Sequence, residues 1–275
     1  MYTAPTDDMQ FLIDDVLDVG TVLGELPHYA DLGLGSDLTT ALLDEAAKFA
    51  SDVVSPLRRV GDANPARCSD SAVTIPPGYG DAIQQLGAGG WVGISAPQDQ
   101  GGQGLPELFG TATCEMWNSA DMAFALEPFL SAGAALAISA HANEALQSTY
   151  LEKIYSGEWS GTMNLTESGA GSDLGPMKTR AELEGDHYRI YGQKIYITWG
   201  DHDATDNIIH LVLARLPDAP EGSRGISLFL VPKFMVNEDG SLGERNDAYP
   251  VSVEHKLGIH GSPTCVMAYG DNGGA

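Results

Sequence analysis

Residues 187–198 read HYRIYGQKIYIT, and this run determines what kind of fold the second half of the chain adopts. It is rich in β-branched and aromatic residues, as are NIIHLVLARL at 207–216 and GISLFLVPKF at 225–234. Runs of this composition, bounded by Gly, Asp, Asn and Pro, predict antiparallel β-strands. We expect the first run to be a hairpin that turns at Tyr191-Gly192.

The part of the chain before Trp159 shows the spacing of helices instead. Apolar residues recur every three or four positions, and Gly and Pro interrupt the pattern. The predicted helices are one at 8–17, one from an N-cap at Ser36-Asp37 to Pro56, one at 79–86, and a long one from Pro106 to Tyr150 that is broken at Pro128.

Together these patterns predict an α+β fold. We expect an N-terminal extension at 1–36, an all-helical domain at 37–158 and a small antiparallel β-barrel or sandwich domain at 159–275. The chain ends in GDNGGA, which has the composition of a loop, so we interpret the chain as a fragment of a longer protein.

The charge balance excludes several classes of partner. The 275 residues include 38 Asp and Glu but only 14 Lys and Arg, which gives a net charge of −24. Such a surface repels nucleic acids and anionic membranes. No apolar run approaches the ~18 residues of a membrane helix, and the N-terminus is acidic where a secretory signal is basic. We therefore expect a cytoplasmic protein.

Side chains that often bind metals are scattered. Cys68, Cys114 and Cys265 are odd in number and form no CxxC pair, so we predict free thiols and no zinc site. His202 lies in a polar turn and His210 lies inside a strand, and we do not interpret either as a metal ligand. A Gly-x-Ser-x-Gly nucleophile motif is also missing from the sequence.

A glycine-rich stretch at 87–90, Gly-Ala-Gly-Gly, could suggest a dinucleotide-binding loop. No strand precedes it and no Lys-Ser/Thr follows it, as a phosphate-binding loop requires. We therefore predict a loop or close-packing role for these glycines.

The polar loop MNLTESGAGSDL at 163–174 is the most informative stretch for function. The turn at 169–172 should leave backbone amides exposed, and the hydroxyls of Thr166, Ser172 and Thr198 can bond the heteroatoms of a flat ring. Side chains alternate along a strand, so Tyr196 should share a face with Thr198. These residues alone leave two interpretations open: a ring-binding edge, or a polar loop beside a half-buried tyrosine.

The same blocks closely resemble the signature of the FAD-dependent acyl-CoA dehydrogenase family, and the resemblance covers most of residues 37–270. The blocks that carry it are LTESGAGSDL (165–174), KTRAE (178–182), YGQKIYIT (191–198), GWVGIS (90–95), QGGQGL (100–105), YLEKIYSGEW (150–159) and KLGIHGSPTC (256–265). Residues 2–11, 201–216 and 224–233 resemble a branch with longer polypeptides, which includes 3-methylmercaptopropionyl-CoA dehydrogenase.

The resemblance implies a reaction. In this family a carboxylate removes the α-proton of an acyl-CoA thioester while a hydride leaves the β-carbon for FAD, which gives a trans-2-enoyl-CoA. The family's base is a glutamate in a C-terminal helical bundle, which is absent here, so the base is expected beyond Ala275. Glu167 is better interpreted as a carboxylate that shapes the loop. The chain alone is predicted to be inactive and to bind FAD weakly or not at all.

The resemblance also assigns residues and partners. It implies an acyl-CoA substrate, an electron-transfer flavoprotein or similar acceptor, and a homo-oligomer at full length. Met163 takes a position that often carries an aromatic residue near the substrate. The implied flavin contacts are Leu165, Thr166, Gly171, Ser172, Tyr196 and Thr198, and the implied substrate contacts are Met163 and Ser172.

Two other functions stay open at this point. One is an acyl-CoA oxidase or related flavoenzyme, which passes electrons to oxygen on the same scaffold. The other is a non-catalytic module that binds flavin or CoA, or one half of a two-chain assembly whose partner contributes the helical bundle.

Overall fold

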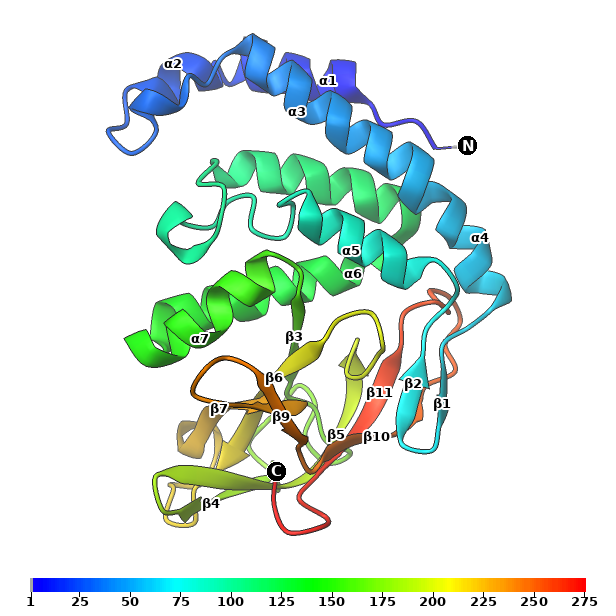
Figure 1. Ribbon diagram of the computed structural model, residues 1–275, viewed down its shortest axis with the longest axis vertical. Coiled ribbons are helices and arrows are strands. Elements are labelled where there is room, and N and C mark those ends of the chain that lie inside the picture. The colour runs from blue at the N-terminus through cyan, green and yellow to red at the C-terminus, as the bar shows by residue number, and fades with distance from the viewer. Residues whose placement is uncertain (1) are drawn as a thin grey trace.

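Helices and strands occupy separate parts of the molecule. The computed structural model describes residues 2–275, so Met1 of the predicted extension lies outside it. Helices form the upper part and strands the lower part (Figure 1). The change from helix to strand comes where α7 (Glu144–Tyr155) ends and β3 (Trp159–Asn164) begins.

The predicted helices are present, and most are longer than expected. The predicted stop at Pro56 is wrong, because helical structure runs from residue 36 to 63. Pro56 lies in the first turn of α4 (Ser55–Ala63), where its missing amide N–H costs no hydrogen bond. The remaining helical elements are α1 (Thr6–Gln10), η1 (Phe11–Val16), α2 (Val19–Gly24), η2 (Ala30–Leu32), α3 (Ser36–Phe49), η3 (Ala50–Val54), α4 (Ser55–Ala63), α5 (Tyr79–Ala88), η4 (Gln98–Gln100), α6 (Glu107–His141) and η5 (Ser223–Gly225).

The long helix α6 is interrupted at a different residue from the one predicted. Pro128 lies inside the helix, and the backbone instead departs from helical geometry at Asp121, with φ −156° and ψ 101°. An 18-residue window of α6 reaches a mean hydropathy of 1.5, which is apolar enough to cross a membrane by composition. Half of that window is buried inside the protein, and the kink divides the helix in two.

The prediction that residues 37–158 are all-helical is wrong at one point. β1 (Arg67–Ser69) and β2 (Ala72–Thr74) form a small antiparallel hairpin. Its turn residues Asp70 and Ser71 both have positive φ, 50° and 57°, as a tight two-residue hairpin turn requires. Val73 joins the hydrophobic core of the strands, so this hairpin belongs by packing to the lower part of the molecule.

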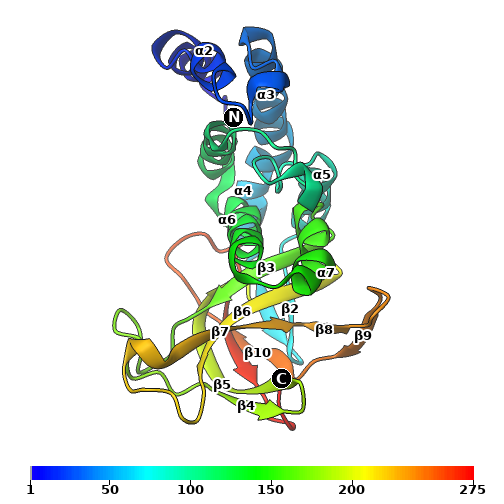
Figure 2. The same cartoon turned by 90° about the vertical axis from the view of Figure 1, so that its left-hand side faces the viewer.

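The lower part is a curled, mixed sheet (Figure 2). The predicted α+β class is confirmed, but the sheet is not purely antiparallel, since β3 and β6 pair in parallel. The strand order is β10-β11-β5-β4-β6-β3, and β7 pairs with β6. The remaining strands are β4 (Arg180–Glu184), β5 (His187–Thr198), β6 (Asn207–Arg215), β7 (Ile226–Pro232), β8 (Phe234–Val236), β9 (Leu242–Arg245), β10 (Ala248–Val253) and β11 (Thr264–Tyr269).

The hairpin predicted at Tyr191-Gly192 is wrong. β5 is one continuous strand of 12 residues, and the turn precedes it, between β4 and β5. Residues of β5 up to Tyr191 pair with β4, and those from Gly192 onward pair with β11. Gly192 therefore marks the place where the strand changes neighbours. Its φ of 147° favours glycine, and a Cβ there would lie 2.6 Å from Thr179 Oγ1.

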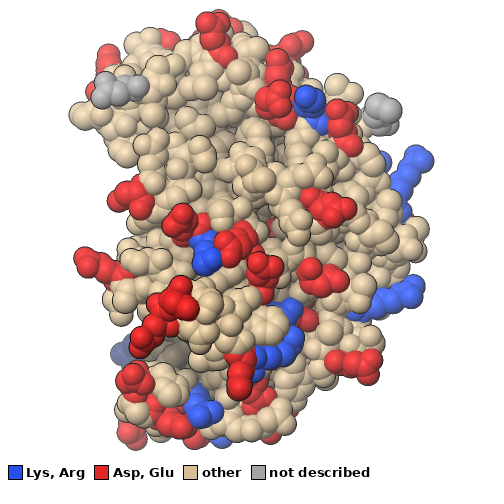
Figure 3. All heavy atoms as spheres, in the orientation of Figure 1, with Lys and Arg blue, Asp and Glu red and all other residues tan. Residues whose placement is uncertain are grey.

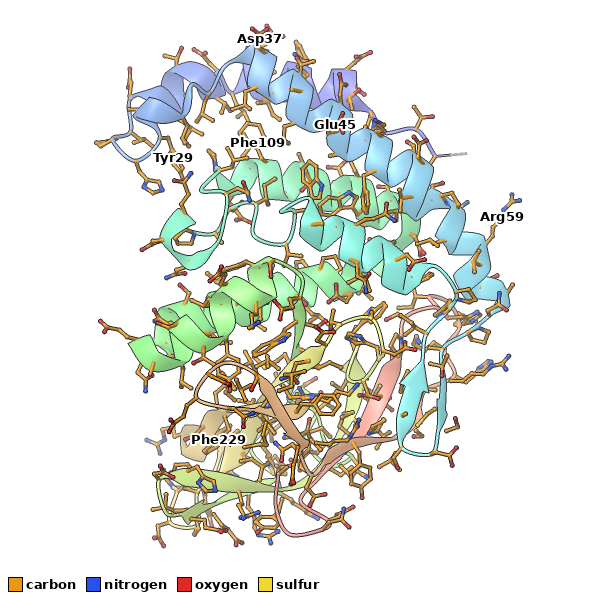
Figure 4. The ribbon with its side chains drawn as sticks, in the orientation of Figure 1. Tyr29, Asp37, Glu45, Arg59, Phe109 and Phe229 are labelled. Carbon is orange, nitrogen blue, oxygen red and sulfur yellow. The ribbon has the colours of Figure 1, made fainter. Side chains whose placement is uncertain are left out.

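Separate hydrophobic cores hold the two parts. Phe109 lies among the helices and Phe229 among the strands (Figure 4). A third cluster joins the two parts: Trp159 and Leu211 of the sheet pack with Tyr150 and other residues of α6 and α7. The sheet is thereby fixed against the second half of α6.

Candidate functional site

The polar loop at 163–174 and the end of β5 lie together, as the sequence predicts. The backbone amide of Ile195 donates to the carbonyl of Thr166 at 2.8 Å. The hydroxyl of Thr162 donates to the carbonyl of Thr198, also at 2.8 Å. We call this unit, residues 163–174 with 194–198, the cradle.

A buried ion pair between Lys194 and Glu167 holds the loop at 163–174 in its conformation. Lys194 is fully buried, and its ammonium donates to Glu167 Oε1 at 2.9 Å and to the carbonyl of Leu165 at 3.0 Å. Glu167 also accepts from the amides of Lys178 and Thr179, at 2.7 and 3.0 Å. The carboxylate is therefore saturated with donors, which agrees with the interpretation of Glu167 as a loop-shaping group.

The titration of this pair follows from its contacts. Burial alone would raise the pKa of Glu167, but hydrogen bonds from Thr179, the Lys178 amide and Lys194 outweigh it, and the net pKa is lowered. Burial lowers the pKa of Lys194, and Glu167 opposes that shift. A carboxylate held ionised by three donors is poorly suited to take a proton from a substrate.

The tip of the loop is a tight turn that faces open space. Glu167 and Ala170 exchange two backbone hydrogen bonds, of 2.9 and 3.0 Å. Gly169, Gly171 and Ser172 are exposed, and a Cβ added at either glycine would meet nothing within 4 Å. The turn therefore leaves room for a ligand at the predicted flavin contacts.

Tyr196 lies in a β-bulge that the sequence did not reveal. Opposite β11, Cys265 pairs with Ile197 but Met267 pairs with Lys194, so β5 carries an extra residue here. Tyr196 has a left-handed φ of 60°, and its side chain is 60% exposed. We expected Tyr196 and Thr198 to share a face because side chains alternate along a regular strand. The bulge interrupts this alternation. The bulge instead directs an aromatic side chain outward beside the loop.

An apolar cavity of about 850 Å³ lies between the helices and the sheet. Met163, a predicted substrate contact, lines it from β3 and thus connects the cavity to the start of the cradle. The sequence analysis missed the wall formed by residues 91–97, because the stretch at 87–104 carried only glycine and turn signals. Other residues that line the cavity include Trp91, Ile94, Trp117, Phe129 and Tyr155.

Polar side chains buried in the sheet support the cradle. Tyr269 donates to Asn164 Oδ1 at 2.7 Å, and its hydroxyl lies 3.4 Å from His210 Nδ1. Burial, with a smaller contribution from Lys233, lowers the pKa of both His202 and His210 to about 3, so both are neutral at pH 7. Within residues 2–275, no group of three or more His, Cys, Asp or Glu is arranged to hold a metal.

The end of β5 is also attached to the helices. Trp199 follows Thr198, and its indole N–H donates to the carbonyl of Ala123 at 3.1 Å. Its ring stacks on Tyr79, with centroids 6.3 Å apart, and Tyr79 donates to the buried carboxylate of Asp121 at 2.6 Å. Asp121 is the residue at which α6 kinks, so the kink and the cradle share one set of contacts.

The remaining predicted features have structural roles. Gly87 packs against α7, since a Cβ there would lie 2.5 Å from the carbonyl oxygen of Ser156. The prediction of a close-packing glycine is confirmed. Cys68, Cys114 and Cys265 are free thiols, as predicted.

Comparison with known proteins places these features in a family. Residues 36–158 match the model of the acyl-CoA dehydrogenase N-terminal domain, and residues 162–271 match that of the middle domain. The chain belongs to the acyl-CoA dehydrogenase family. It carries the N-terminal and middle domains, which correspond to the helical part and the sheet.

The relatives extend well beyond this chain. It is 45% identical over 269 residues to 3-methylmercaptopropionyl-CoA dehydrogenase from Ruegeria pomeroyi. The alignment covers 98% of this chain but only 45% of the relative. It is 36% identical over 192 residues to the mitochondrial isovaleryl-CoA dehydrogenase from Pongo abelii, which covers 68% of this chain and 42% of the relative. The chain thus spans less than half the length of these relatives.

Solved structures show the same fold. An acyl-CoA dehydrogenase complexed with FAD from Bacillus anthracis superimposes with a TM-score of 0.67, over 86% of this chain and 36% of that one, at 23% identity. This similarity supports the α+β arrangement of helices and curled sheet.

Proposed function

We propose that this chain supplies the N-terminal and middle domains of an FAD-dependent acyl-CoA dehydrogenase, which converts an acyl-CoA thioester to a trans-2-enoyl-CoA. An electron-transfer flavoprotein or similar acceptor, a homo-oligomeric assembly and a cytoplasmic location belong to the same proposal. The observation that carries it is the contact between the loop at 163–174 and the end of β5, beside an apolar cavity of about 850 Å³.

The cradle fits a flat redox ring. It combines an open turn, an exposed aromatic side chain and two partly exposed threonines, Thr166 and Thr198. In this proposal Leu165, Thr166 and Thr198 would hold the ring by backbone and hydroxyl contacts, with the exposed side chain of Tyr196 beside it. Gly171 and Ser172 contribute contacts at the turn. When bound, FAD would supply the acceptor for a hydride.

The cavity fits the acyl group of a thioester. Its lining is mostly aliphatic and aromatic, and its two charged side chains, Glu107 and Glu115, are acidic, which favours an apolar chain over an anionic one. Met163 lines the cavity and is also the first residue of the cradle, so the two adjoin there. The helices and the sheet would therefore hold the substrate and the ring in one orientation, and such positioning contributes much of the rate in reactions of this kind.

The catalytic base lies outside these 275 residues in this proposal. Glu167, the carboxylate inside the flavin loop, is occupied by Lys194 and two backbone amides. We therefore expect the isolated chain to show no turnover, and to bind FAD weakly or not at all.

A chimera tests the proposal. The part of the Ruegeria pomeroyi relative that lies outside the alignment is fused to this chain, since 45% identity over the shared part makes a compatible interface reasonable. The chimera is expected to purify with flavin absorbance and to reduce an artificial acceptor when acyl-CoA is added. The isolated chain, measured in parallel, is expected to do neither.

Two results would contradict the proposal. One is a chimera that unfolds cooperatively but carries no flavin. The other is turnover by the isolated chain, because it would place the base within residues 1–275. Oxygen consumption with peroxide formation in the chimera would favour the oxidase alternative over the dehydrogenase.

A further inference from the structure

The N-terminal extension carries an apolar outer face. Its helical elements lie at the upper edge of the molecule (Figure 1), where α1 and η1 contact α3 and α2 extends beyond the start of α3. Met9, Ile13 and Val19 are buried against the helices beneath. Six other large apolar side chains, all between positions 11 and 26, are 45–56% exposed. They are Phe11, Leu12, Val16, Leu17, Val22 and Leu26, and we call them the outer face.

Acidic side chains surround this face. Positions 1–47 hold ten Asp and Glu and no Lys or Arg, the first of which is Lys48. Asp7, Asp15, Asp18 and Glu25 are exposed on or next to the segment that carries the outer face. Acidic side chains are also visible along the upper edge of the molecule in Figure 3. Six exposed apolar residues in so short a segment, with a polar rim, mark an interaction surface.

The negative charge of the acidic side chains around the outer face, which we call the rim, indicates what kind of molecule binds there. A second copy of the chain would bring the same acidic rim against itself, and an anionic lipid surface would be repelled. A polypeptide segment with an apolar face and flanking Lys or Arg would satisfy both the apolar residues and the acidic rim.

A relative that matches the extension also has additional polypeptide that is available as an occupant. The 269 aligned residues make up 45% of the Ruegeria pomeroyi relative, whereas 192 aligned residues make up 42% of the Pongo abelii relative. Because these two shares are nearly equal, the Ruegeria pomeroyi relative, with the longer aligned part, is the longer protein and has more polypeptide outside the alignment. This relative also matches 98% of this chain, and therefore most of its N-terminal extension.

We propose that the outer face of the extension is a docking site for a protein segment that has an apolar face rimmed by Lys and Arg. Such a segment lies across η1 and α2, with its apolar side chains on Phe11, Val16 and Leu17 and its cations next to Asp15 and Asp18. This inference does not depend on the proposed catalytic function.

The test uses the 275-residue chain and a fluorescently labelled, 18-residue amphipathic peptide of Leu and Lys. Fluorescence anisotropy is expected to show saturable binding that weakens as salt is added. The triple variant Phe11→Ser, Val16→Ser, Leu17→Ser is expected to bind at least about tenfold more weakly. The matched control Leu183→Ser, Leu228→Ser, Val251→Ser removes three similarly exposed apolar side chains elsewhere at the same net charge, and should bind as the original chain does.

Two further measurements complete the test. Asp15→Asn with Asp18→Asn changes only the rim and is expected to weaken binding at low salt. A Leu and Glu peptide of the same length is expected not to bind. The proposal is overturned if the outer-face variant binds as well as the original chain, or if the control loses as much affinity. It is also overturned if sedimentation shows a dimer of the original chain that the outer-face variant abolishes, because a second copy would then be the occupant.

Discussion

The cradle and the apolar cavity adjoin each other but are held together in different ways. The cradle depends on a buried Lys194–Glu167 pair and on backbone hydrogen bonds between loop and strand. The cavity depends on close packing of helix on sheet, with Gly161 of β3 pressed against Ala134 of α6. Removal of one polar partner in the cradle leaves another buried group unsatisfied, whereas a change in the cavity wall costs in proportion to the volume changed.

The largest loss of stability is expected from a substitution in the cradle. Lys194→Met leaves the Glu167 carboxylate buried without its cation, so the free energy of unfolding should fall by about 3–5 kcal/mol. Urea denaturation of the 275-residue chain measures the change. Lys178→Met is the control, because that side chain is exposed, and it should change stability by less than about 0.5 kcal/mol.

A double variant sharpens this prediction. Glu167→Gln combined with Lys194→Met removes both charges, so it should be less destabilising than the sum of the two single variants. Additive effects would mean that the pair is not coupled, and the account of the cradle would then be wrong.

The next largest loss of stability is expected where Gly161 of β3 packs against Ala134, a residue of α6 that lines the cavity. A Cβ on Gly161 would lie 2.4 Å from the Cβ of Ala134, so Gly161→Ala should destabilise the protein by about 1–3 kcal/mol. Gly133→Ala, on the same helix as Ala134, meets nothing within 4 Å and should be neutral or stabilising by up to about 1 kcal/mol. Equal thermal shifts for the two variants would show that helix and sheet do not pack as described.

The polar region should also make stability depend on pH. His210 has a pKa near 3 in the folded protein, against an ordinary value of 6.5, so between these values the unfolded chain binds a proton that the folded chain excludes. Stability therefore falls as pH decreases from about 6.5 towards 3. His210→Gln should make the slope smaller by about 1.4 kcal/mol per pH unit. Denaturation curves between pH 7 and 4, measured for this variant and for the original chain, compare the two slopes.

The smallest effect on stability is expected at the surface of the cradle. Tyr196 is 60% exposed, so Tyr196→Ser should change the free energy of unfolding by less than about 0.5 kcal/mol. The flavin content of the chimera should nevertheless fall, because the ring loses its aromatic neighbour. A large loss of stability would show that Tyr196 serves the fold rather than a ligand.

The sequence predicted the features that depend on local pattern. The β-branched runs identified β5, β6 and β7, and the polar loop with the end of β5 was recognised as one unit. The loop-shaping role of Glu167 followed from the family motif, but its partner Lys194 did not, although the alternation of β5 places this lysine on the buried face with Ile190.

Features that depend on distant contacts were missed. Pro128 is a strong local signal for a break, yet α6 kinks at Asp121, where Tyr79 from another helix donates to the carboxylate. The bulge at Tyr196 depends on pairing with β11, which is distant along the chain. The cavity walls come from α6, a glycine-rich loop and β3, and no periodicity connects these segments.

The most direct test of the cradle fills it with a side chain. Gly171→Leu in the chimera places a bulky group at the open turn, and Gly258→Leu is the control, since a Cβ at either glycine meets nothing within 4 Å. Both variants should unfold at the temperature of the unmodified chimera. We predict that visible absorbance will show at least about tenfold less flavin in Gly171→Leu and a full complement in Gly258→Leu. Full flavin content in Gly171→Leu would contradict the assignment of this loop as the flavin site.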